Sequence, residues 1–441
     1  MAKKLALFGG EKEVTLPFPK WPQVTEEMIK EVVRVMREET LSILTKTGIQ
    51  KRLEDEFAEY QGRKYAFAVN GGTAALHIAI AIAGVGPGDE VIVSPYTWGS
   101  TVGCILHQNA IPVFVDIDPK TFNIDPTKIE QRITPSTKAI IVVHIYGHPA
   151  DMDPIMEIAK KHNLIVIEDA AQAHGAIYKG KKVGSIGDIG CFSFQASKNL
   201  PAGEGGIIVM DDEELYQKAI LFGAHSVRQM QEVKDERLRR YIDDVCWNYR
   251  IHPIGAAIAR VGLKYLDERN KIKQENMEYL SQGLKEVPGI EPPYVAPGCT
   301  HGYHMYPLTY KKEEIEDLDR EKFIAAMRAE GVPLFHYVGL PIHLRTRFQE
   351  HYYYGKGCPW KCPFARREVI YREGDCPVAE YRCKETELNL PGSPFVEPCR
   401  ELLDQIISAF KKVTHPDNIR ELKRAQIELP DKEIYKRYRR A

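Results

Sequence analysis

The sequence predicts an α/β fold in which a large domain with a largely parallel sheet is followed by a second, C-terminal domain. Three observations favour this fold class. The chain has 441 residues, more than a single hydrophobic core usually serves. Between residues 64 and 210, short apolar runs alternate with helical segments over five rounds. Near residue 252 the alternation gives way to a long helical pattern, as expected where the chain leaves the first domain.

The predicted strands, in order along the chain, are five short runs rich in β-branched residues, which are typical of strands buried on both faces. They cover residues 65–69, 90–93, 111–115, 139–143 and 164–167. The predicted helices between them cover residues 73–83, 99–108, 126–132 and 153–161. Parallel sheets place their ligand sites beyond the carboxyl ends of the strands, so the polar residues that follow these runs are the first site candidates.

Residues 1–266 are predicted to form the large domain together with an N-terminal segment, and residues 267–441 the smaller one. One long helix, from residue 253 to about residue 278, is expected to join them. An aperiodic stretch at about residues 347–375, rich in Tyr, Pro, Cys and Gly, is predicted to be a long irregular insertion. For the basic tail at residues 432–440 we expect a solvated helical end.

Charge and hydropathy indicate a cytoplasmic protein. With 60 basic and 61 acidic residues the formal net charge is -1, so neither nucleic acid nor a membrane surface is expected as a partner. No apolar run reaches the roughly 18 residues of a membrane span, and the first ten residues hold too few apolar side chains for a signal peptide.

Nine cysteines leave metal binding and disulfide formation to be weighed. Cys358 and Cys362 form a close pair, but no second close pair follows, so no metal site is predicted. Local packing is the favoured interpretation, with a disulfide as the alternative.

The first polar constellation is Asn70-Gly71-Gly72-Thr73, which follows a predicted strand and opens a predicted helix. Glycines let the backbone approach an anion, free amides at the helix start point toward it, and Thr73 adds a hydroxyl. A phosphate cradle is one interpretation, and ordinary turn chemistry is the other. The spacing fits neither a P-loop nor a dinucleotide-binding fingerprint.

Two further strand ends carry informative residues. Trp98 follows the second strand, where it could pack locally or stack on a planar ring. Glu168 and Asp169 end an otherwise apolar strand, and carboxylates there are costly to bury without a cationic or hydrogen-bonding partner. A protonated ring nitrogen would be such a partner, whereas a helix cap would account for only one of the two carboxylates.

Lys198 lies in a glycine-rich segment that begins at Ser193 and ends in Gly203-Glu-Gly-Gly206. Most lysines are solvated surface charges, and Lys198 alone would be given that interpretation. Its position favours a second one, in which the amine forms an imine with an aldehyde cofactor.

With these residues the chain resembles the DegT/StrS family of sugar and cyclitol aminotransferases, which are fold-type I enzymes that depend on pyridoxal 5′-phosphate. The resemblance covers nearly the whole chain. It is most specific in the ordered set Gly72-Thr73, Glu168-Asp-Ala-Ala-Gln-Ala-His174 and Ser193-x-x-x-x-Lys198-Asn-Leu. It implies a large domain with a mostly parallel mixed sheet and a smaller C-terminal α/β domain.

The resemblance also implies roles for single residues. Lys198 would carry the cofactor as an imine and shuttle the proton between substrate and cofactor carbons, and Asp169 would keep the pyridine nitrogen protonated. Trp98 would stack on the ring, and Gln172 would lie near its hydroxyl. The phosphate would be held by Gly72, Thr73 and Ser193.

Three further positions are implied by the same resemblance. Asn248-Tyr249-Arg250 matches a segment that crosses the dimer interface in this family. Asn248 would then reach the phosphate in the neighbouring subunit, and the enzyme would be a homodimer with shared sites. Arg250 is a candidate to bind a substrate carboxylate. His304 matches a position near the substrate, with structural packing as the alternative.

The chain departs from the family pattern at Gly71, where many members have serine, so one phosphate hydroxyl would be absent. Some relatives have histidine in place of the lysine and dehydrate the sugar, so the presence of Lys198 favours amino transfer. The irregular insertion resembles a feature of certain cyclitol-aminating members.

The resemblance implies transfer of an amino group from glutamate or glutamine to a keto-sugar, often nucleotide-linked, or to a keto-cyclitol such as an inosose. One alternative is the aromatising elimination of a 3-amino-5-hydroxybenzoate synthase. Another is a non-catalytic regulatory protein that binds pyridoxal phosphate, which the intact set of Lys198, Asp169 and Gln172 disfavours.

Overall fold

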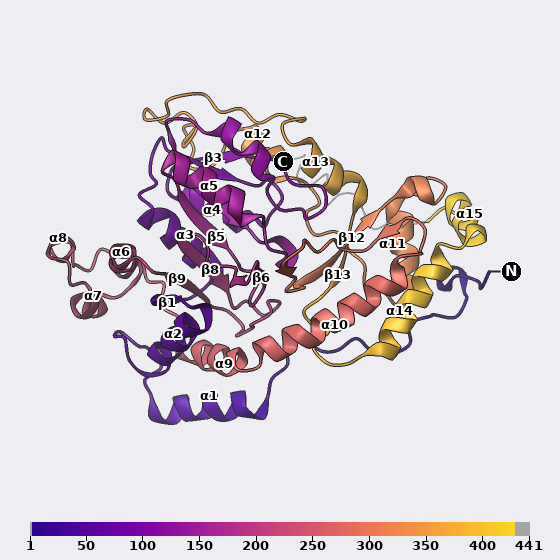
Figure 1. Cartoon of the computed structure of the whole chain (residues 1–441), viewed down its shortest axis with the longest axis horizontal. Coiled ribbons are helices and arrows are strands. Elements are labelled where there is room, and N and C mark those ends of the chain that lie inside the picture. The colour runs from indigo at the N-terminus through magenta and orange to yellow at the C-terminus, as the bar shows by residue number, and fades with distance from the viewer. Residues whose placement is uncertain (1, 428–441) are drawn as a thin grey trace.

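The computed structural model describes residues 2–427 and contains a central seven-stranded sheet (Figure 1). Its strands lie in the order β1-β9-β8-β5-β4-β2-β3. Their bounds are β1 (Tyr65–Val69), β2 (Glu90–Val93), β3 (Ile111–Phe114), β4 (Thr137–Val143), β5 (Ile165–Asp169), β8 (Ile189–Ser193) and β9 (Gly206–Met210). Strand β9 pairs antiparallel with β1 and β8, and the other pairs are parallel. The predicted mostly parallel mixed sheet is therefore confirmed.

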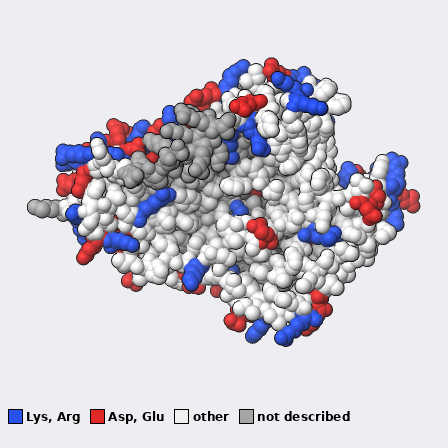
Figure 2. All heavy atoms as spheres, turned by 180° about the vertical axis from the view of Figure 1, so that it is seen from behind, with Lys and Arg blue, Asp and Glu red and all other residues white. Residues whose placement is uncertain are grey.

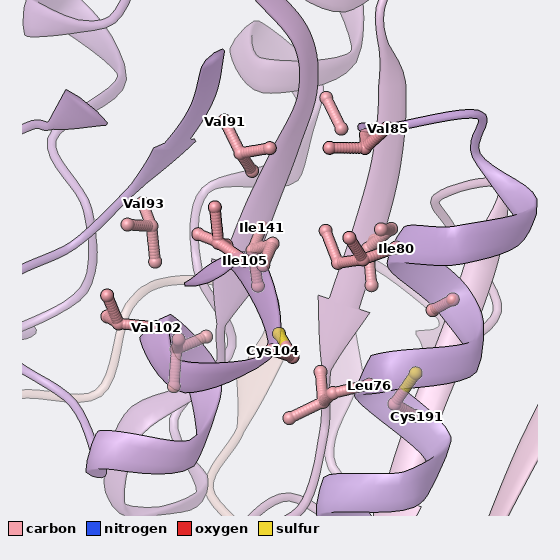
Figure 3. Close-up of a cluster of buried hydrophobic side chains, with 14 of the residues drawn as sticks. Leu76, Ile80, Val85, Val91, Val93, Val102, Cys104, Ile105, Ile141 and Cys191 are labelled. Atoms are coloured by element: carbon pink, nitrogen blue, oxygen red, sulfur yellow. The ribbon is translucent and has the colours of Figure 1, made fainter. Parts of the chain in front are cut away.

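Helices cover both faces of this sheet, because side chains alternate between the faces along each strand. Phe67 and Val69 of β1 belong to one core, and Ala66 and Ala68 belong to the other. The first core is closed by α3 (Gly72–Ile82), α4 (Gly99–His107) and α6 (Glu213–Gly223), and the second by α2 (Gly48–Gln61), α5 (Met152–His162) and α9 (Pro253–Leu263). Figure 3 shows side chains of α3 and α4 meeting those of the sheet in the first core.

Two predicted helices differ from the structure. Residues 126–132 form two short 3₁₀ turns, Pro126–Lys128 and Glu130–Arg132. Ile129 is the one fully buried residue of this stretch, so it offers no apolar face on which a full helix could pack. The expected long helix is divided into α9 and α10 (Leu266–Leu284), since Lys264 and Tyr265 donate to carbonyls only three residues back.

A smaller unit follows, built on an antiparallel sheet in the order β10-β12-β13. Its elements are β10 (Ile290–Glu291), β12 (Met305–Tyr310), β13 (Glu387–Pro391), α11 (Arg320–Ala329), α14 (Arg400–Val413) and α15 (Pro416–Arg424). Helix α10 leads from the large sheet to this unit and packs on α14 (Figure 1). The remaining elements are α1 (Glu26–Glu38), α7 (Ser226–Glu232), α8 (Glu236–Arg239), α12 (Thr346–Gln349), α13 (Pro377–Tyr381), β6 (Ile177–Tyr178), β7 (Lys181–Lys182) and β11 (Cys299–Thr300).

Two segments pack across the boundary expected at residue 266. Leu5 and Val14 of the N-terminal segment lie in the core of the small unit, where the Glu330 carboxylate accepts two backbone N–H groups of that segment. The irregular insertion instead packs on the large sheet, where the Tyr371 hydroxyl donates to the Pro112 carbonyl at 2.7 Å. The insertion thereby covers β3, the edge strand of the sheet, and limits the exposure of its apolar side chains.

The surface in Figure 2 carries basic and acidic side chains interspersed, and neither sign forms a continuous patch on this face. That pattern agrees with the formal net charge of -1. Within residues 2–427, no helix combines the length and apolar character that crossing a membrane requires. The basic tail predicted at residues 432–440 lies outside the described residues.

Candidate active site

The predicted phosphate residues come together at the carboxyl end of the sheet. Helix α3 begins at Gly72, directly beside the end of β8, and a Cβ at Gly72 would lie 2.7 Å from the Ser193 Cβ. The missing side chain therefore lets the helix start approach Ser193. Thr73, in the first turn, is exposed to solvent. The free amides of this helix start, together with the two hydroxyls, can bind an anion such as phosphate.

The backbone does not require glycine at residue 71. Its φ of 179° is extended, and no atom lies within 4 Å of the position that a Cβ would occupy. The hydroxyls available here are those of Thr73 at the helix start and Ser193 at the end of β8, with none at residue 71.

Asp169 ends β5 with its carboxylate almost fully buried. The carboxylate accepts the Thr101 hydroxyl at 2.7 Å and the Ala171 N–H at 3.2 Å. Burial raises the pKa of Asp169, although these two bonds and the Lys198 amine act in the opposite direction. Within residues 2–427, Lys198 and His144 act on Asp169 through their charges and not through a hydrogen bond. A cationic ligand group would offset this burial, so the carboxylate fits the protonated ring nitrogen of a pyridine cofactor.

The neighbouring Glu168 points to the other face of β5 and is held entirely by the protein. Its carboxylate accepts three backbone N–H groups and the His144 ring N–H. The three amides belong to Gly184, Ile186 and Gly187. These hydrogen bonds outweigh the effect of burial and hold the pKa of Glu168 below its usual value. Of the two acids, only Asp169 is therefore left to bind a ligand.

Lys198 lies close enough to Asp169 for their charges to interact. Burial of the Lys198 amine lowers its pKa to about 8, against the attraction of Asp169, which raises it. The loop that carries Lys198 is braced, because the Trp21 indole donates to the Lys198 carbonyl at 3.2 Å. A lysine with this pKa has a substantial neutral fraction near pH 7 to 8, as attack on an aldehyde requires.

Gln172 and Trp98 are joined by a residue that the sequence did not single out, Tyr337. The Gln172 Oε1 accepts the Tyr146 N–H at 2.6 Å, and its Nε2 donates to the Tyr337 hydroxyl at 2.7 Å. Trp98 is 63% exposed and stacks on the Tyr337 ring at a centroid distance of 6.5 Å. Trp98 therefore has a ring face that a planar ligand could cover.

The segment predicted to serve a neighbouring subunit lies beside the phosphate loop of its own chain. The Tyr249 carbonyl accepts the Asn70 N–H at 2.8 Å, and Arg250 forms a bridge with Val69. The Asn248 side chain is exposed and Arg250 is partly exposed. Both are thus accessible to a second chain or to a ligand.

His304, the second candidate for substrate binding, is almost completely buried in the structure. Its Nδ1 lies 3.1 Å from the Ser393 hydroxyl, which in turn donates toward the Lys198 loop through the Ser197 carbonyl at 3.0 Å. Burial holds the pKa of His304 well below its usual value, so the ring is neutral. This geometry favours the packing interpretation, and contact with a substrate stays a prediction.

The cysteines show no metal centre in the part of the chain that the structure describes. There, no group of three or more His, Cys, Asp or Glu side chains could hold a metal ion. All nine cysteines are free thiols. Cys362 is buried, and Cys376 and Cys383 belong to the first core, in agreement with local packing.

The sequence of the chain was compared with known protein families and relatives. The chain matches the DegT/DnrJ/EryC1/StrS aminotransferase family over residues 22–400. It is 41% identical over 299 residues to GDP-perosamine synthase of Caulobacter vibrioides, covering 66% of this chain and 76% of the relative. It is 36% identical over 349 residues to L-glutamine:2-deoxy-scyllo-inosose aminotransferase of Streptoalloteichus tenebrarius, covering 76% and 81%. A pleiotropic regulatory protein of Geobacillus stearothermophilus is 37% identical over 373 residues, covering 84% and 91%.

Solved structures agree with this assignment. An aminotransferase from Psychrobacter cryohalolentis has a TM-score of 0.78 at 30% identity, covering 90% of this chain and 98% of that one. A 3-amino-5-hydroxybenzoic acid synthase has a TM-score of 0.75 at 28% identity, covering 89% and 98%. The chain therefore belongs to the DegT/DnrJ/EryC1/StrS aminotransferase family and is an enzyme of that family.

Proposed function

We propose that the protein binds pyridoxal 5′-phosphate at Lys198 and transfers an amino group from glutamate or glutamine to a keto-sugar or keto-cyclitol. One observation carries this proposal. The Lys198 amine, with its pKa lowered to about 8, lies near the carboxylate of Asp169, which is almost fully buried and whose pKa is raised by that burial. The names of the two synthase and aminotransferase relatives support a sugar or cyclitol acceptor.

The cofactor, when bound, supplies an aldehyde for the lysine amine and a ring that accepts electrons from the substrate. The protein's own residues would orient it. Asp169 would hold a proton on the ring nitrogen, because its buried carboxylate favours a cation there. Trp98 would cover one face of the ring, and the Gln172 amide would donate to the ring hydroxyl. The phosphate would be bound by Gly72, Thr73 and Ser193.

Lys198 would also move the proton that amino transfer requires. Its Nζ, once released as a free amine, would take a proton from the substrate carbon and return it to the neighbouring cofactor carbon. An amine with a pKa near 8 can do both near neutral pH, because substantial fractions of it are neutral and protonated there.

The active form is proposed to be a cytoplasmic homodimer with shared sites. Asn248 would contact the phosphate in the neighbouring subunit, and Arg250 would bind a substrate carboxylate. An interface is supported by Val245 and Trp247 of the same segment, whose large apolar side chains are 89% and 54% exposed. Nine free thiols support a reducing compartment.

The amino donor and the acceptor class can be tested together. The purified holoenzyme would be mixed with glutamate, glutamine and other amines while the absorbance of the bound chromophore is followed. We expect conversion with glutamate or glutamine, and recovery of the original spectrum when 2-deoxy-scyllo-inosose or a nucleotide-linked keto-sugar is added. No conversion with any amine would contradict the proposal and favour a regulatory role, and an aromatic product would favour the elimination chemistry.

A further inference from the structure

One hydrogen bond fixes the orientation of the Gln172 side chain. The Gln172 Oε1 accepts the Tyr146 backbone N–H, and a backbone N–H can only donate. The Gln172 Nε2 therefore takes the other side, where it donates to the Tyr337 hydroxyl oxygen. Because that oxygen acts as the acceptor in this bond, the phenolic proton of Tyr337 is left for a different acceptor.

The described chain supplies no such acceptor. Within residues 2–427, the contact with Gln172 is the only hydrogen bond of the Tyr337 hydroxyl. Burial, followed by the charge of Asp169, raises the pKa of Tyr337 above its usual value, so the phenol keeps its proton at neutral pH. Tyr337 is partly buried, and its hydroxyl proton is available to an acceptor that a ligand would bring. Its neighbours Trp98, Gln172 and Asp169 are the residues proposed to surround the cofactor ring.

Tyr337 is held in place by a carboxylate of the small unit. Glu387, at the start of β13, is fully buried. It accepts the backbone N–H groups of Tyr337 and Val338 at 2.6 and 3.0 Å. It also accepts the Tyr146 hydroxyl at 3.1 Å, so one carboxylate supports both neighbours of Gln172. The small unit thereby fixes the position of a donor at a site that is otherwise built by the large sheet.

We propose that Tyr337 donates a hydrogen bond to an oxygen in the active site, and that Glu387 is the positioning residue that keeps it there. The oxygen belongs either to the hydroxyl of the cofactor ring or to the keto substrate. Both can accept a hydrogen bond beside Gln172. This inference rests on the proposed function, since both oxygens belong to it.

The test replaces Tyr337 by phenylalanine, which removes the donor and keeps the ring that stacks on Trp98. A donor to the cofactor oxygen predicts a shifted absorption spectrum or pH titration of the bound chromophore, with both half-reactions slowed about tenfold. A donor to the substrate predicts an unchanged spectrum and donor half-reaction, with KM for the ketone raised about tenfold. The ketone is whichever of 2-deoxy-scyllo-inosose and a nucleotide-linked keto-sugar the wild type converts.

A second variant separates positioning from stability. Glu387→Gln keeps the shape of the side chain but removes its charge, and should reproduce the Tyr337→Phe change in weaker form. Tyr371→Phe is the matched control, because that buried hydroxyl is satisfied by Pro112, in a different part of the protein. It should lower the unfolding midpoint without moving the spectrum or KM.

The inference is overturned if Tyr337→Phe matches the wild type in spectrum, pH titration and both half-reactions. The positioning role of Glu387 is overturned if Glu387→Gln alters only the unfolding midpoint while Tyr337→Phe changes the spectrum, the half-reactions or KM. A wild-type protein without a bound chromophore, or one that converts no amine and no ketone, contradicts the proposed function itself.

Discussion

Replacing Asp169 by asparagine should leave the cofactor bound and slow proton abstraction strongly. The amide retains the shape of the carboxylate, and the Thr101 hydroxyl can accept from it because Thr101 also lies 2.9 Å from the Thr97 hydroxyl. The lost interaction is that of a buried carboxylate with a protonated ring nitrogen. At a separation of about 3 Å and an effective dielectric constant of roughly 20, this attraction is about 5 kcal/mol.

Part of that energy is retained as a neutral hydrogen bond, so we expect a loss of roughly 3 to 4 kcal/mol, or about 10²- to 10³-fold in rate. Stopped-flow absorbance of the half-reaction with the amino donor measures it directly. Asp116→Asn is the control, because this buried carboxylate accepts two backbone N–H groups of α13, outside the proposed site. A half-reaction of Asp169→Asn within about twofold of the wild-type rate would refute the reasoning.

Three further predictions follow from buried groups and from the proposed shared site. His174 and His304 have folded pKa values below the usual one, to about 3 for His174, so the unfolded state binds more protons below pH 6.5. Lowering the pH from 7.5 to 5.5 should therefore reduce the free energy of unfolding by about 1 kcal/mol for each, and a flat denaturant midpoint would contradict this. Glu168→Ala should lower the free energy of unfolding by roughly 3 to 5 kcal/mol, because three N–H groups and one imidazole lose their acceptor. A loss below about 1 kcal/mol would show that water replaces the carboxylate as the acceptor. Asn248→Ala should weaken cofactor retention, and mixing it with a Lys198→Ala chain should restore one intact site per dimer; no recovery of activity would place Asn248 outside the neighbouring site.

The sheet was predictable because parallel strands buried on both faces carry continuous β-branched runs, and 65–69 and 90–93 are strands with those bounds. The paths of the N-terminal segment and of the insertion could not be predicted. Apolar residues such as Leu5 and Tyr371 indicate that a segment is buried, but they do not indicate in which core it is buried. Only the folded chain decides between two available cores.

The site was predictable where its residues follow strands, as Thr73, Asp169 and Lys198 do. Tyr337 was missed because it lies in an irregular segment far from Gln172 in the sequence. No local sequence pattern indicates that its hydroxyl meets the Gln172 side chain. Glu387 was missed as well, because it begins a short strand in which a second polar residue, Asn389, interrupts the apolar pattern. The structure was needed to show that Glu168 is fully hydrogen-bonded within the protein and that Asp169 is the one left as a site candidate, because adjacent residues of a strand point to opposite faces.

The proposed covalent attachment of the cofactor to Lys198 can be measured directly. Borohydride reduction of the holoenzyme would fix the cofactor to the amine that carries it, and mass spectrometry of the peptides would then locate the label. We predict a single label on Lys198, with an unlabelled protein when Lys198 is replaced by alanine. A label on another lysine, or none on the wild-type chain, would contradict the account.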